Sequence, residues 1–290
     1  MHDIFPTSFS RRAFLGMSAV ALTPAISRAH LAPASAQVQT GSSRYLIASS
    51  YVPGIQAQDS AAYAVLTAAN TFVIDDPLSP SAWTQANTPS PFTAMARYRS
   101  FAQMQTDFSA NSVHSIYRSS GWFLYDPEFS TGWGTPDAEA NDPWTACRHV
   151  GQYLHGKDYR VLMAPARDLG NAPNPVKPKL SGESLDEWYL RVHVGFCAEH
   201  ADYFDVQAQA DTTVAPAPTT YHDFYAGARS DVLDPTSGNP YAITFAGIST
   251  AYGTATQMLA AIHSGITYGG IWLNIPDNDY AKAAAFLKGV

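Results

Sequence analysis

The sequence has few charged residues and few cysteines. Of its 290 residues 14% are charged, and 17 Lys and Arg stand against 24 Asp and Glu. The small number of basic residues argues against electrostatic binding of nucleic acid. The hydrophobic content of 46% argues against intrinsic disorder. The formal net charge is -7 at pH 7. These values predict a compact, soluble and mildly acidic protein and leave its chemistry open.

Several motifs of hydrolases and nucleotide-binding proteins are missing from the sequence. It contains no G-x-S-x-G nucleophile elbow and no glycine-rich phosphate-binding loop. Several of the nine histidines fall on predicted helices, and none forms a His-x-His pair on a strand, which argues against a zinc or binuclear hydrolase. We therefore expect no metal and no cofactor.

The N-terminal segment predicts export. Arg11 and Arg12 precede a short apolar run, and Phe14 and Leu15 complete the S-R-R-x-F-L pattern of the bacterial Tat signal. An A-x-A triplet at 34–36 offers a cleavage site, so we expect a signal peptide over 1–36 and a secreted or periplasmic mature protein. The apolar run over 13–26 is too short to span a bilayer, and we expect no stable membrane insertion after cleavage.

The rest of the chain alternates between strand-like and helix-like segments. Short apolar runs of strand character lie at 44–51, 71–76, 121–126, 159–166, 203–209, 241–247 and 270–275. An eighth strand is expected over 112–119. Seven or eight such alternations in about 250 residues predict an α/β fold, a (β/α)8 TIM barrel with one irregular or missing strand. We expect a single barrel domain over 37–290.

Two of the predicted helices carry start signals. Asp142 followed by Pro143 supplies an N-cap and a first-turn proline. Ser184 and Glu187 form a capping box ahead of a segment that ends near His200.

The two cysteines, Cys147 and Cys197, fall on these two successive outer helices. Parallel helices would place the two positions about 12 Å apart along their axes, at about 1.5 Å per residue, which is too far for a disulfide. We expect two buried free thiols.

Polar residues follow the predicted strands at the end where a barrel places its active site. The segment 121–128 ends in Asp126-Pro127-Glu128, and residues two apart in an extended chain face the same way. Two neighbouring carboxylates repel as anions, which keeps one of them protonated as a general acid. The alternative is that Asp126 caps a turn and Glu128 is solvated.

Amides and aromatic residues end other strands. Gln207 and Gln209 share one face of a buried strand, and Trp272 and Asn274 alternate near the end of the last one. Amides suit sugar hydroxyls and acetamido groups, although a buried structural amide network or a packed indole is the alternative. The expected substrate-binding residues are Gln207, Gln209, Trp272, Asn274, Tyr51 and Asp168. Weaker candidates are Asp75, Asp76, Trp133, Arg167, Ser249 and Thr250.

In this order the strand ends resemble those of the chitinase and hevamine-like (family 18 type) glycoside hydrolase barrels. The resemblance rests on Asp126-Pro127-Glu128, Ala164-Pro165, Gln207 with Gln209, and Gly269-Gly270-Ile271. It implies a barrel in which Glu128 is the proton donor, and it places amides where that family has a Tyr and a Trp. The Gln-Ala-Gln and Trp-Leu-Asn-Ile-Pro strand ends are also similar to those of uncharacterised secreted actinobacterial proteins.

The expected function is that of a secreted glycoside hydrolase-like enzyme acting on a glycan, with Glu128 as general acid and Asp126 assisting. Its partner would be a carbohydrate or another small substrate. One alternative is a non-catalytic glycan-binding barrel, which the amide replacements motivate. Another is a barrel lyase or isomerase that uses the same acids on a non-sugar substrate.

Overall fold

A computed structural model describes residues 44–129, 134–213 and 217–290. The expected signal peptide over 1–36 lies outside them, as does Trp133. Eight parallel strands pair in chain order and close into a barrel. They are β1 Arg44–Ala48, β2 Thr71–Asp75, β3 Thr93–Tyr98, β4 Trp122–Tyr125, β5 Arg160–Met163, β6 Tyr203–Val206, β7 Ile243–Ser249 and β8 Gly270–Asn274.

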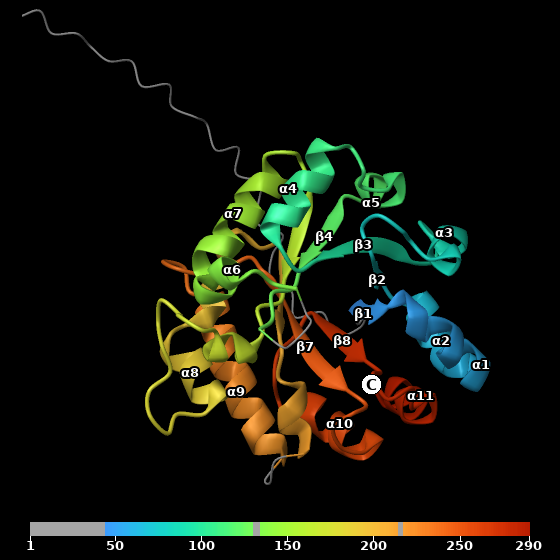
Figure 1. Ribbon diagram of the computed structural model, residues 1–290. Helices are drawn as coiled ribbons and strands as arrows, with labels where there is room; N and C mark the ends of the chain where they lie inside the picture. Colours follow the sequence, from blue (N-terminus) through green and yellow to red (C-terminus); the bar gives the residue numbers. More distant parts are fainter. Residues whose placement is uncertain (1–43, 130–133, 214–216) are drawn as a thin grey trace, which may run out of the picture. The chain divides into compact units, whose positions relative to one another are not determined.

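Helices surround the strands (Figure 1). The α-helices are α1 Val52–Gln58, α2 Ser60–Ala68, α3 Ala82–Asn87, α4 Phe101–Ser109, α5 Ser115–Ser120, α6 Asp137–Asn141, α7 Pro143–His155, α8 Leu185–Arg191, α9 Ala217–Val232, α10 Ala255–Ile262 and α11 Tyr280–Gly289. The 3-10 helices are η1 Ser49–Tyr51, η2 Arg167–Asn171, η3 Val194–His200 and η4 Gln209–Thr213. This architecture is a (β/α)8 TIM barrel, as the alternation predicted. In the described ranges no helix has the length and hydrophobicity needed to cross a bilayer.

One predicted strand is wrong. Most of the segment 112–119 belongs to α5, which begins at Ser115 and whose N-cap His114 accepts a hydrogen bond from the Ile116 N–H. The third strand is instead β3, which pairs with β2 and β4. Its sequence, TAMARY, escaped prediction because Ala, Met and Arg all favour helices and Thr93 is its only β-branched residue.

Alternate residues of the strands fill the barrel interior with apolar side chains. Leu46, Phe72, Ile74, Met95, Trp122, Leu124, Leu162, Ala164 and Phe245 form this inner cluster. Near the amino ends of the strands the Trp122 ring stacks on that of Tyr203, with 4.4 Å between centroids, and Phe72 meets Trp122 edge-on at 5.0 Å. These three rings form an aromatic layer beneath the carboxyl end of the barrel.

The expected helix starts are confirmed, whereas one expected helix is shorter than predicted. Asp142 caps α7 by accepting from the Thr145 N–H, and Ser184 and Glu187 form the capping box of α8. However, α8 ends at Arg191, and the chain continues as η3 to His200.

Both cysteines are free and buried, as expected, but their expected separation is wrong. Cys197 lies in η3, which packs closely against α7: a Cβ at Gly151 would come within 2.4 Å of the His200 Cβ. Burial, together with the neighbouring Cys197 thiol, raises the pKa of Cys147 well above its usual range. Because the thiolate is the reactive form, this thiol is inert in the folded state.

We expect neither thiol to react with Ellman's reagent until the protein unfolds. Unfolding in guanidinium without reductant should then release both cysteines, Cys147 and Cys197. Absorbance at 412 nm before and after unfolding measures this. Finding no reactive thiol after unfolding would instead reveal a disulfide.

Candidate functional site

A polar cavity of about 180 Å³ opens at the carboxyl ends of the strands, above the inner cluster. Residues from β1, β2, β3, β6, β7 and β8, and from the turns that follow β1, β4 and β6, converge on it. The polar and aromatic ones are those of Ser50, Tyr51, Arg97, Asp126, Glu128, Asp205, Gln207, Gln209, Trp272 and Asn274. Residues from distant parts of the chain meet here because parallel strands all end on the same side of a barrel.

Asp126 lies at the bottom of the cavity, next to Gln207. It is 1% exposed, and the Gln207 Nε2 donates to its Oδ1 at 3.1 Å. The same Nε2 donates to the Ala164 carbonyl oxygen at 2.8 Å, so both amide hydrogens of Gln207 are used. Gln207 is therefore fixed, and it holds one Asp126 oxygen in place.

The proton affinity of Asp126 is high for a carboxyl group. Burial raises its pKa to about 7, while the charges of Arg97 and Arg99 oppose the rise. Near neutral pH, Asp126 can therefore hold or release a proton.

Asp205 is a second buried acid, which sequence reasoning missed. It is 1% exposed, and neither of its carboxylate oxygens has a hydrogen-bond partner among the described residues. Burial, and to a smaller extent the charge of Asp126, raises its pKa well above the usual range. Burial therefore favours the neutral form of Asp205, whose carboxyl oxygens have no partner among the described residues.

Gln209 also has a buried oxygen without a partner. Its Oε1 accepts no hydrogen bond within the described part of the chain. Gly247 makes room for it, because a Cβ at that position would lie 2.7 Å from the Oε1. Buried polar atoms are normally paired, so three unpaired oxygens in one cavity indicate a place for ligand donors.

Glu128 lies higher in the cavity than Asp126 and is half-buried. Its backbone N–H donates to the Thr135 hydroxyl at 3.1 Å, and the next N–H, of Phe129, donates to Asp168 at 3.0 Å. These two bonds hold the turn that carries Glu128.

At the opposite rim, the Tyr51 hydroxyl donates to the Asn274 Oδ1 at 3.3 Å. Trp272 lies beside Asn274 on β8 and is half-buried, so part of its indole faces the cavity. This rim therefore combines an aromatic surface with an amide.

Seven of the eight expected site residues line the cavity, and Asp168 does not. Asp168 supports the turn of Glu128 through the Phe129 N–H. Its neighbour Arg167 forms ion pairs with Asp186 and Asp211.

The other weak candidates also have structural contacts. Asp75 accepts from the hydroxyl groups of Ser49 and Thr84 at 2.9 and 2.7 Å. The Thr250 hydroxyl donates to Asp277, and Ser249 accepts from the Ala251 N–H. Asp76 lines a neighbouring cavity with Arg97 and Arg99.

Arg97, like Asp205, lines the cavity but was not predicted. It lies on β3, the strand that was missed, so no pattern placed it at the barrel mouth. Asp205 was within reach of sequence reasoning, because it shares the strand face of Gln207 and Gln209 and an acid in an apolar strand is unusual.

The fold and the cavity together define a (β/α)8 barrel with an acid- and amide-lined pocket at the carboxyl ends of its strands. No family model matches the chain, and a search of curated proteins found no match. The resemblance to the chitinase-type barrels therefore stays a prediction. Among the described residues, no group of three or more His, Cys, Asp and Glu is placed to hold a metal ion.

Proposed function

We propose that the protein is a glycoside hydrolase-like enzyme that acts on a glycan, exported by the Tat signal at Arg11 and Arg12. The observation that carries the proposal is the set of unpaired buried oxygens of Asp205 and Gln209 in a cavity that also contains two further acids. A sugar ring supplies several hydroxyl donors to such oxygens. Acids beside it supply proton transfer to a glycosidic oxygen.

Glu128 is the proposed general acid and Asp126 assists it. Glu128 is the more accessible of the two, so it can reach the oxygen of a leaving group that points toward solvent. Asp126, held by Gln207, orients the substrate and removes a negative charge from the neighbourhood when it is protonated. General acid assistance of this kind is typically worth about 10²- to 10⁴-fold in rate.

The cavity size limits what can enter. Its volume of about 180 Å³ is below the range of about 300–1,000 Å³ typical of pockets that enclose a whole drug-sized ligand. It suits one sugar unit, with Trp272 as a stacking surface and Asn274 and Gln209 as hydrogen-bonding groups. We therefore propose that the enzyme binds the end of a saccharide chain.

The proposal is tested by incubating the purified protein with a panel of neutral and N-acetylated oligosaccharides and measuring released reducing ends. Product formation supports it. Saccharide binding in calorimetry without products after long incubation would favour the non-catalytic glycan-binding barrel. Neither binding nor products across the panel would remove the glycan assignment.

Gly247→Ala should disturb the site without removing any polar group. The new Cβ would contact the Gln209 Oε1 at 2.7 Å, so the amide must shift. A displacement of this size at a substrate-positioning group is expected to lower kcat/KM about 10-fold. Steady-state kinetics measures this, and a thermal melt distinguishes it from loss of folding. Unchanged kinetics would mean that Gln209 does not position the substrate.

A further inference from the structure

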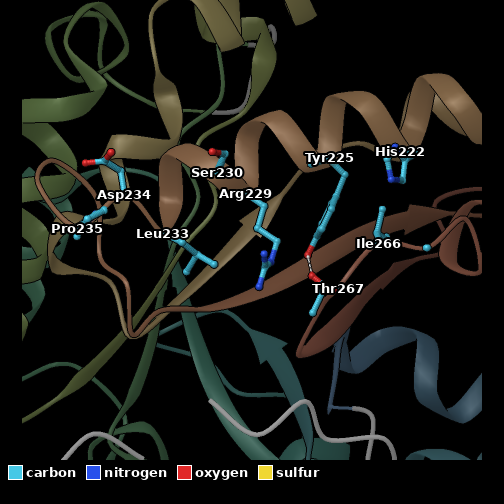
Figure 2. Close-up of a pocket in the computed structure, with 11 residues that line it drawn as sticks. His222, Tyr225, Arg229, Ser230, Leu233, Asp234, Pro235, Ile266 and Thr267 are labelled. Carbon is cyan, nitrogen blue, oxygen red and sulfur yellow. Dashed lines mark hydrogen bonds between the residues drawn. The ribbon is translucent and has the colours of Figure 1, made fainter. Parts of the chain in front are cut away.

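A second cavity, of about 490 Å³, lies between α9 and the loop that precedes β8. Figure 2 shows its lining residues, among them Tyr225, Arg229 and Leu233 of the α9 side and Ile266 and Thr267 of the loop. It shares no described lining residue with the acid- and amide-lined pocket. Because the loop leads into the start of β8, this cavity is at the amino end of the barrel.

Arg229 has no partner in this cavity. Its Nε is buried without a hydrogen bond, and the guanidinium forms no ion pair with any residue that the structure describes. In Figure 2 its side chain extends from the same side of α9 as that of Tyr225. The Tyr225 hydroxyl is already used, since it donates to the Thr244 hydroxyl at 3.0 Å.

The acid among the described lining residues, Asp234, forms no ion pair with Arg229. Asp234 accepts hydrogen bonds from the N–H groups of Thr236 and Ser237, both at 2.8 Å. Its side chain extends away from Arg229 in Figure 2. Arg229 therefore lies half-buried beside the cavity, with a buried Nε that has no partner among the described residues and could pair with an anion.

The lining also has donors and apolar surface for a ligand. The backbone N–H groups of Gly265, Ile266 and Thr267 donate no hydrogen bond within the described residues. Leu233 and Ile266 add apolar walls. A guanidinium fork matches the two oxygens of a carboxylate, and among the described lining residues Arg229 is the only Lys or Arg, which suits a single negative charge.

We propose that this cavity binds a small organic carboxylate, with Arg229 pairing with its two oxygens and Leu233 and Ile266 contacting its apolar part.

A purely structural role for Arg229 makes different predictions. Arg229 lies in the last turn of α9, where a positive charge interacts favourably with the helix dipole. In that case replacing it lowers the melting temperature without any ligand present, and the melting temperature of the wild type does not respond to carboxylates.

The test is thermal unfolding of the purified protein with benzoate and with its neutral analogue benzamide, at constant ionic strength. Benzoate should raise the melting temperature in proportion to the logarithm of its concentration once that exceeds the Kd, by about 3–6 °C at ten times the Kd, and benzamide should not. Arg229→Gln should abolish the response. Arg148→Gln is the matched control, because Arg148 is exposed and pairs with Glu199, and it should respond as the wild type does.

Two outcomes would overturn the proposal: a wild type whose melting temperature responds to benzoate no more than to benzamide, or an Arg229→Gln variant that responds in full. A response to inorganic phosphate but not to benzoate would overturn the carboxylate assignment. Should Arg229→Gln fail to fold, Arg229→Lys keeps the charge but loses the planar fork, and its Kd for benzoate should rise about tenfold. None of these readouts depends on hydrolysis, so the result is independent of the proposed function.

Discussion

Glu128→Gln is expected to lower kcat on a hydrolysed saccharide by about 10²- to 10⁴-fold, because the amide N–H is not acidic enough to protonate the leaving oxygen. The side chain keeps its size and stays half-buried in the cavity. The backbone bond from the residue 128 N–H to Thr135 does not involve the carboxylate, so it persists. We therefore expect KM and the melting temperature to change little. Initial rates of reducing-end release measure kcat and KM, and a thermal melt measures the melting temperature.

A matched control for this experiment is Glu199→Gln. Glu199 is a surface glutamate whose side chain is 45% exposed and pairs with Arg148, and it does not line the cavity. This variant should keep wild-type kcat. Full activity in Glu128→Gln would remove Glu128 as the general acid, whereas an equal loss in both variants would point to a defect unrelated to proton transfer.

Asp126→Asn is expected to remove a pH-dependent loss of stability from the folded protein. The folded state raises the pKa of Asp126 from its ordinary 3.8 to about 7, so between these values it binds a proton that the unfolded chain releases. Stability therefore falls as the pH rises from about 4 to about 7 and stays low above that. A pKa rise of this size corresponds to a loss of up to about 4 kcal/mol. The Asp126→Asn side chain cannot ionise, so the variant should lose less stability than the wild type as the pH rises.

Denaturant unfolding at pH 4, 6 and 8 measures this difference between Asp126→Asn and the wild type. Asn keeps the oxygen that accepts from Gln207, so the packing of the cavity is retained. Asp158→Asn is the control, since Asp158 is exposed and its φ of 62° is one that Asn adopts readily. It should follow the wild type at every pH. Parallel stability curves for all three proteins would show that Asp126 is not buried as a neutral acid.

Much of the fold followed from the hydrophobic pattern, and the missing part has a physical cause. Seven strands could be predicted because they are short apolar runs between turn signals. β3 could not be predicted, because its Ala and Met residues favour a helix and only its pairing with β2 and β4 makes it a strand. Tertiary pairing of this kind overrides local preference and cannot be read from a single segment.

The candidate site divides in the same way. Residues at the ends of predicted strands, such as Glu128 and Asn274, could be assigned to the mouth because strand parity fixes the side they face. Arg97 could not, since its strand was unknown. The thiols show a further limit: the distance between Cys147 and Cys197 depends on where α8 ends, and helix ends are set by contacts made in three dimensions.

The aromatic layer of Phe72, Trp122 and Tyr203 has a consequence for proton exchange. It lies below Asp126 and Asp205, so water reaches these acids from the mouth, where a ligand would sit. A bound ligand separates the two acids from bulk water, so their protonation states are fixed when the ligand binds. Uptake or release of a proton becomes part of the binding equilibrium, and the calorimetric enthalpy of binding varies with the ionisation heat of the buffer.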